Sequence, residues 1–172
     1  MHSISVRCNL LLTTCLTYLI FLHAICILYG WVNHLKSRPQ AVVSFGNLVS
    51  WKKLPNQFGE NAVVTFQLDA DLQSLWNLNV KYVYLYLVAE YSSPRFPWNQ
   101  VTVWDRYVER GSSVFSAFPF YNTLGLHNYV DTLRNASLVF RLEADIIPFV
   151  GFVFHTTLGQ TDKVRFPLEY TV

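Results

Sequence analysis

Hydrophobic and polar positions divide the chain into two parts that meet near residue 40. Between Arg7 and Lys36 there are 28 consecutive positions without Asp, Glu, Lys or Arg. The most apolar part, residues 10–32, has 23 residues and would form a helix of about 34 Å, enough to cross a hydrocarbon layer of about 30 Å. The pattern therefore predicts a transmembrane helix over 10–32, after a short N-terminal segment (1–9) and before a juxtamembrane linker (33–39).

The same apolar segment has a second interpretation, a signal peptide that is cleaved. The apolar region of a signal peptide has about 7–15 residues and ends at small side chains, whereas this one is longer and ends at Tyr29 and Trp31. Aromatic rings at that place suit the headgroup level of a membrane, so a retained anchor is favoured. The alternative stays open: a secreted or cell-surface β-sandwich that binds ligands, with its leader removed.

From residue 40 onward the pattern changes to a period of two, which is typical of β-strands. Residues 62–69 place Val64, Phe66 and Leu68 on one face, and residues 137–145 alternate in the same way. These features predict an all-β fold, a single antiparallel β-sandwich domain over 40–172 tethered to one N-terminal transmembrane helix. Strands are expected near 41–51, 62–69, 80–91, 100–108, 114–121, 137–145 and 149–168, the last in one or two pieces, with a short helical turn within 71–77.

The predicted linker holds the domain close to the membrane. Its seven residues (33–39) reach about 23 Å when extended. They contain no Gly/Ser-rich or Pro-rich spacer. Partners of the domain are therefore expected beside the membrane.

The orientation across the membrane is less clear from the residues. Arg7 precedes the apolar segment, while four cations follow it, so the positive-inside rule would place the large C-terminal part in the cytoplasm. Asn135-Ala136-Ser137 opposes that count, because it is an acceptor sequence for N-glycosylation, which marks a lumenal surface. All three cysteines lie in or beside the apolar segment, which leaves the domain free of thiols.

Composition and motifs give little sign of catalysis. The net charge is +2 without a basic run, so nucleic acid is not an expected partner. Five scattered histidines and single glycines form no metal, phosphate or nucleophile motif, so no metal, cofactor or small-molecule substrate is expected. Asp69 and Asp71 suit Ca²⁺ or acid–base chemistry, but a solvated strand end explains them more simply. A hydrolase would have to draw Ser, His and Asp from isolated positions.

One apolar segment near the C-terminus is a candidate interface. Residues 146–154 (IIPFVGFVF) contain no charged side chain, and they form either a buried strand or an exposed apolar edge for a partner or for lipid. Pro148 and Gly151 argue against a central strand. We expect Phe149 and Phe152 to contact a partner protein.

Several motifs together resemble the signal peptidase complex subunit 3 family. They are DADLQSLW at 69–76, NVK at 79–81, LYLVAEY at 85–91, NQVTVWD at 99–105, and the closing Phe166-Pro167 with Tyr170. The resemblance covers nearly the whole chain and is strongest over 69–111. The sequon at Asn135 lies where that family carries its lumenal glycosylation site.

The resemblance implies a single-pass type II protein of the endoplasmic reticulum membrane, with residues 1–9 cytosolic and the domain 40–172 in the lumen. It implies a non-catalytic accessory subunit, which would assemble with a catalytic serine-protease subunit and with small membrane subunits that together remove signal peptides. That assignment would decide the orientation against the positive-inside count. Phe149 and Phe152 would then face the catalytic subunit, and membrane lipid is the other expected partner.

Overall fold

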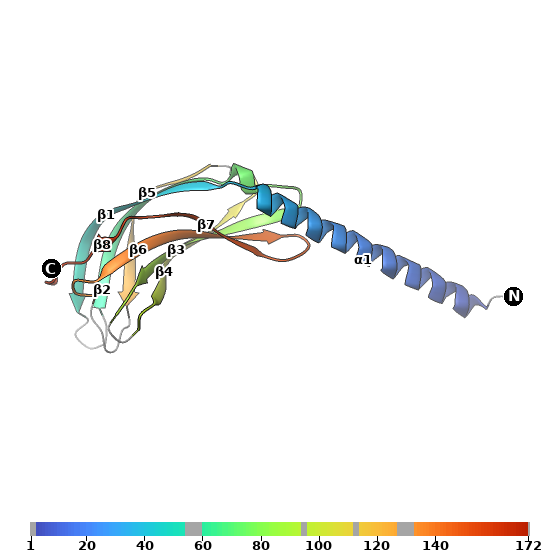
Figure 1. Cartoon of the computed structure of the whole chain (residues 1–172), viewed down its shortest axis with the longest axis horizontal. Helices are drawn as coiled ribbons and strands as arrows, with labels where there is room; N and C mark the ends of the chain where they lie inside the picture. Colours follow the sequence, from blue (N-terminus) through green and yellow to red (C-terminus); the bar gives the residue numbers. More distant parts are fainter. Residues whose placement is uncertain (1–2, 54–59, 94–95, 112–113, 127–132, 172) are drawn as a thin grey trace.

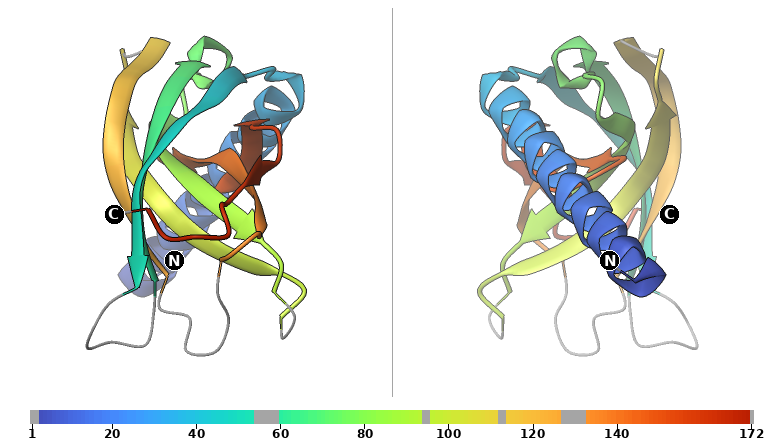
Figure 2. Two further views of the ribbon diagram at one scale, coloured as in Figure 1. Left: turned by 90° about the vertical axis from the view of Figure 1, so that its left-hand side faces the viewer. Right: turned by 90° about the vertical axis from the view of Figure 1, so that its right-hand side faces the viewer.

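The structure is a computed structural model that describes residues 3–53, 60–93, 96–111, 114–126 and 133–171, with 114–126 described by their backbone. A long helix, α1, is followed by strands that form two antiparallel sheets (Figures 1 and 2). The helix projects from one end of the β-domain, and the C-terminus lies at the other end (Figure 1). This confirms the predicted all-β sandwich with one N-terminal apolar helix.

The helix α1 (Ile4–Lys36) is long and apolar enough to cross a membrane, and its most apolar stretch is not buried. It begins at Ser3, whose hydroxyl accepts a hydrogen bond from the N–H of Val6. The hydroxyls of three threonines inside the apolar part donate to carbonyls four residues earlier, at 2.7–2.8 Å, so these groups are satisfied without water.

The helix continues beyond the predicted span, from residue 32 to Lys36, and only residues 37–39 connect it to the first strand. The predicted linker 33–39 is therefore mostly helical. Asn33 allows this because its side chain donates to the carbonyl of Tyr29 at 2.7 Å. The helix ends where Pro39 forces the residue before it out of the helical region. Where the membrane begins and ends along α1 stays a prediction.

The strands form one sheet of three and one of five. The order β1-β2-β5 makes the first sheet, with β1 (Gln40–Lys53), β2 (Glu60–Asp71) and β5 (Val114–Leu126). The order β4-β3-β6-β7 makes the second, with β3 (Val80–Tyr91), β4 (Asn99–Glu109), β6 (Ser137–Pro148), β7 (Phe154–Gln160), and β8 (Val164–Arg165) paired to β6. The 3-10 turn η1 (Gln73–Leu75) lies between β2 and β3 and confirms the helical turn expected there.

The core lies between the two sheets, where the period of two predicted it. Val64, Phe66 and Leu68 of β2 are buried, and so are the inward residues of β6 from Leu138 to Ala144. The rings of Phe66 and Phe140 meet edge to face with centroids 4.6 Å apart, which joins the sheets. Each sheet thus keeps an outer face that the core does not use.

The C-terminal part differs from the strand expected over 149–168. The strand β6 continues to Pro148, residues 149–153 form a loop, and β7 begins at Phe154. Pro148 has no N–H to donate, and Gly151 has a φ of +115°, so the chain leaves the sheet here. The strand prediction is confirmed in two pieces, β7 and β8, and is wrong for 149–153.

Candidate functional site

The outer face of the five-stranded sheet carries a dense group of polar and aromatic side chains. Side chains alternate across a strand, so Leu85 and Leu87 of β3 point inward while Tyr84 and Tyr86 point outward. Antiparallel pairing then places Tyr86 opposite Glu143 of β6. We call this surface the outer face and define it by Tyr82, Tyr84, Tyr86, Glu90, Gln100, Asp105, Tyr107, Arg141, Glu143, Asp145 and His155.

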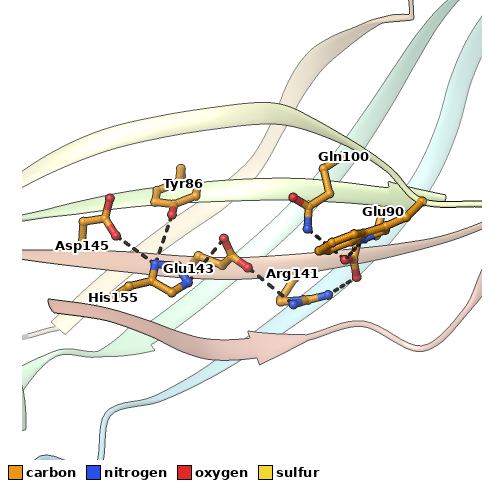
Figure 3. A network of polar contacts seen from close by, with 8 residues as sticks. Tyr86, Glu90, Gln100, Arg141, Glu143, Asp145 and His155 are labelled. Atoms are coloured by element: carbon orange, nitrogen blue, oxygen red, sulfur yellow. Dashed lines mark hydrogen bonds and ion pairs between the residues drawn. The ribbon is translucent and has the colours of Figure 1, made fainter.

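Glu90 is the centre of one half of this network (Figure 3). Its carboxylate forms an ion pair with Arg141 and accepts hydrogen bonds from Trp98 Nε1 at 2.6 Å and Gln100 Nε2 at 2.9 Å. Partial burial acts to raise the pKa of Glu90, but the hydrogen bonds from Gln100, Trp98 and Arg141 outweigh it and hold that pKa below its ordinary value. The carboxylate is therefore charged and held in one position.

His155 of β7 organises the other half (Figure 3). Its Nδ1 lies 2.9 Å from Asp145 Oδ1 and 3.2 Å from the hydroxyl oxygen of Tyr86, and its Nε2 lies 3.8 Å from Glu143. Burial, and then the charges of Asp145 and Glu143, raise the pKa of Tyr86 to about 12. Tyr86 is consequently a neutral phenol. Glu143 also lies 3.6 Å from Arg141, which links the two halves.

Tyrosine rings cover the rest of the outer face. The ring of Tyr107 on β4 lies 4.7 Å from that of Tyr84 and 5.3 Å from that of Tyr82, centroid to centroid. The hydroxyl of Tyr84 donates to Asp105 at 3.0 Å, and burial, with help from Asp105, raises the pKa of Tyr84. Rings that are apolar on their faces and polar at their tips are enriched in protein interfaces.

His155 and Asp145 have the arrangement of a base and its orienting carboxylate. Among the described residues, however, the hydrogen-bond partners of His155 are Tyr86 and Asp145, and neither is a serine, threonine or cysteine. The phenol of Tyr86 is held neutral and is a poor nucleophile. The cluster is therefore suited to hold charges in place for recognition and not to attack a peptide bond.

A second candidate site is the place where α1 meets the β-domain. We call it the joint. Gly30 is the buried residue of α1, and a Cβ there would lie 3.5 Å from Asn79 and 3.6 Å from Phe154. The ring of His34 stacks on Phe154 with centroids 4.7 Å apart. One helical turn earlier, Ile27 lies against Gly151. A Cβ added to Gly151 would lie 3.3 Å from the side chain of Ile27.

The β6–β7 loop (residues 149–153) is part of this joint and is held by Asn79. The side-chain amide of Asn79 donates to the carbonyl of Val150 at 2.7 Å and accepts from its N–H at 3.1 Å. The N–H of Phe149 donates to the carbonyl of Asn79 at 2.7 Å. Phe149 and Phe152 are nevertheless 63% and 68% exposed, so the segment is an apolar surface and not a buried strand. Which partner covers it stays a prediction.

The sequon lies at the other end of β6. Asn135 is exposed in a tight turn with a φ of 59°, and its side-chain oxygen accepts from Nε of Arg165 at 2.7 Å. The strand β6 has 12 residues, which at about 3.3 Å each separates this turn from the joint by roughly 40 Å. A glycan here would therefore lie far from the helix. Whether Asn135 carries one stays a prediction.

Comparison with known proteins identifies the family. A family model described as "Signal peptidase subunit" matches residues 1–169. The chain is 31% identical to signal peptidase complex subunit 3 of Caenorhabditis briggsae over 99% of this chain and 97% of that protein. It is 31% identical to the Drosophila melanogaster subunit over 99% and 97%, and 46% identical to the Gallus gallus subunit over 67% and 66%. The chain belongs to the signal peptidase complex subunit 3 family.

Membership confirms the resemblance seen in the motifs and makes this chain a subunit of that complex and not an enzyme. Of the carboxylates Asp69 and Asp71, Asp71 has a local structural role in this subunit 3 chain, because it accepts from the N–H of Gln73 at 2.9 Å at the start of η1. Among the described residues no three His, Cys, Asp or Glu side chains gather to hold a metal ion.

Two features of this subunit 3 chain were missed by sequence reasoning. The first is the network on the outer face. The sequence shows that Arg141, Glu143 and Asp145 alternate along β6, but their partners Glu90 and His155 lie on other strands. Asn79 stood in a recognised motif without a role, and the structure shows that it holds the β6–β7 loop. No local pattern marks either contact.

Proposed function

We propose that this chain is a non-catalytic accessory subunit of the endoplasmic reticulum signal peptidase complex and braces the catalytic serine-protease subunit beside the membrane. In this proposal the chain is a single-pass type II protein, with 1–9 cytosolic and the domain in the lumen. The other partners are the small membrane subunits and membrane lipid. The complex removes signal peptides from nascent secretory proteins.

The stiff joint is the observation that carries the bracing role. Only residues 37–39 separate α1 from β1, and the last helical turns pack on the domain through Gly30 and His34. A domain held in this way keeps one height and one direction relative to the bilayer. A protease that cuts near a membrane surface needs its active site at a fixed height, and such a neighbour supplies it.

The same joint supports a retained helix over a cleaved leader. Removing α1 would expose Phe154, on which His34 stacks, and Gly151, against which Ile27 lies. The secreted or cell-surface alternative therefore loses support. The lumenal orientation is supported by the exposed sequon at Asn135, since glycosylation acts on the lumenal side.

The outer face is the surface that we propose for the catalytic subunit. It is partly exposed and rich in tyrosine, and it carries charges held by several partners each, as in the cluster of Glu90 and Arg141. Held charges cost little ordering entropy on binding. That Phe149 and Phe152 bind the catalytic subunit remains a prediction, and their position favours lipid, as argued below.

An insertion at the joint tests the bracing role. Six Gly and Ser residues between Ser37 and Arg38 should leave the complex assembled but slow signal-peptide cleavage several-fold, because the domain no longer fixes the height of its partner. The control places the same six residues before Ser3, where the joint is untouched. Assembly is measured by co-purification from microsomes in mild detergent, and cleavage by the rate on a secretory reporter. Normal cleavage by the inserted variant within an intact complex would reject bracing.

A further inference from the structure

We propose that the β6–β7 loop (residues 149–153) inserts into the membrane leaflet from which α1 emerges, so that lipid acyl chains cover Phe149, Phe152 and Val153. The domain would then touch the bilayer at two points, its helix and this loop. The inference depends on α1 crossing a membrane. It does not depend on which complex the chain joins.

The depth of the loop follows from its contact with α1. A hydrocarbon layer of about 30 Å takes about 20 helical residues. The charged Arg7 and Lys36 must lie outside this layer. The membrane-spanning residues therefore fall within the 28 uncharged positions 8–35. Every stretch of about 20 within that range includes residue 27, from 8–27 at one extreme to 16–35 at the other. Gly151 lies directly against Ile27, and the loop is therefore at the level of the hydrocarbon.

The side chains of the loop suit that place. Phe149, Phe152 and Val153 are 63%, 68% and 56% exposed, and residues 149–153 contain no charged or polar side chain. Leu78, next to Asn79, is 80% exposed at the same end. Large apolar side chains exposed together on a small domain mark an interaction surface. Here they continue the exposed apolar surface of α1, which lipid already covers if the helix spans.

Part of the backbone of the loop has hydrogen-bond partners within the protein and needs no water. Unpaired N–H and C=O groups are costly in hydrocarbon. Asn79 satisfies both backbone groups of Val150 and, through its own carbonyl, the N–H of Phe149. Asn79 thus acts as the positioning residue of the loop.

Two cations flank the segment that holds the loop. The guanidinium of Arg110 donates to the carbonyl of Asn77, two residues before Asn79, and Lys81 is exposed two residues after it. Lys and Arg beside an apolar segment favour the headgroup region. A five-residue loop is also small for a stable protein interface, which buries about 800 Å² on each side.

Depth can be measured on the full chain in phosphatidylcholine vesicles. With Cys8, Cys15 and Cys26 replaced by Ala, a nitroxide label is attached at Phe152→Cys, and in a second variant at Tyr107→Cys. Tyr107 is similarly exposed but lies on the outer face. The label at 152 should be several-fold more accessible to oxygen than to a water-soluble nickel chelate, and the label at 107 should show the reverse. Equal behaviour of the two labels would overturn the proposal.

Two further arms keep the result unambiguous. Adding Asn79→Ala should make the label at 152 shallower while the label at 107 keeps its spectrum, which shows that the domain is still folded. In the assembled complex, the label at 152 should stay accessible to oxygen. Loss of access to both reagents there would show that a protein covers the loop, and the lipid proposal would be wrong. Any of these failures leaves the bracing role to be judged by its own insertion experiment.

Discussion

The outer face and the β6–β7 loop are both exposed and both rich in aromatic side chains, yet they differ in how their polar groups are used. On the outer face the polar atoms are at the tips of side chains, and they form a network around Glu90 and His155. In the loop the side chains are wholly apolar and the polar atoms are in the backbone, where Asn79 satisfies both groups of Val150 and the N–H of Phe149. The first arrangement suits a partner that brings its own hydrogen bonds and water. The second suits a partner that offers none.

This difference shows why exposure by itself does not identify a partner. Phe152 and Tyr107 are exposed to a similar degree, but Tyr107 lies among tyrosine rings, while Phe152 follows Gly151, which lies against the apolar helix α1. The contrast predicts that variants of the two regions will separate assembly from lipid contact. The four predictions below run from the largest expected effect to the smallest.

Removing two rings from the outer face should have the largest effect. Tyr84→Ala with Tyr107→Ala should weaken binding of the catalytic subunit about thirtyfold or more, because the loss of even one central interface tyrosine costs of order 2 kcal/mol. Co-purification in mild detergent across a dilution series measures this. The matched control is Val42→Ala with Leu168→Ala, which removes exposed apolar side chains elsewhere. Unchanged binding by the tyrosine variant would remove the outer face as the proposed interface.

A larger side chain in the joint should detach the helix from the domain. Gly30→Leu would push against Asn79 and Phe154, which already lie at ordinary contact distance from a Cβ, and overpacking costs about 1–3 kcal/mol. The rate of amide hydrogen exchange at 149–153 should rise in proportion to this loss of joint stability, while the rate in the core strands stays unchanged. Leu28→Phe is the control, since Leu28 points away from the domain. Equal exchange in the two variants would mean that the joint does not hold the loop.

Acid should weaken the outer face through Glu90. Its pKa is lowered in the folded chain, so the ionised carboxylate adds stability above its ordinary value near 4.5, and this stability is lost as the pH falls through the lowered value. The contribution is about 1 kcal/mol, as for a typical hydrogen bond in a folded protein. Glu90→Gln should flatten the fall in thermal unfolding temperature below pH 4.5, and Glu109→Gln should not. A parallel fall in all three proteins would assign the acid sensitivity to other groups.

Shortening the loop side chains should have the smallest effect on assembly. Phe149→Ala with Phe152→Ala should keep the catalytic subunit in detergent within about twofold, because lipid is the proposed partner of these rings and a twofold change is only about 0.4 kcal/mol. In vesicles the same variant should exchange the amides of 149–153 several-fold faster. Release of the catalytic subunit in detergent would instead show that these rings bind it, as the sequence analysis expected.

Part of the candidate site was visible in the sequence. The alternation in 137–145 assigned Leu138 and Phe140 to the core and left Arg141, Glu143 and Asp145 outside, and the structure agrees except that Glu143 is buried. The apolar run 146–154 was also recognised as an exposed surface or a strand, and Gly151 pointed to the break that occurs. What was not visible is the pairing of Asp145 with His155 and of Arg141 with Glu90.

The sequence by itself determined the apolar helix, the strands, their inward faces and the family, because periodicity, charge-free length and motifs are local properties. Only the tertiary structure decided which strands are neighbours and where the loop lies. Strand register joins Tyr86 to Glu143, and the joint brings Gly30 to Asn79 and Ile27 to Gly151, residues 49 to 124 positions apart. Contacts of that kind depend on how sheets pack and how a helix leaves them, and no period in the chain records them.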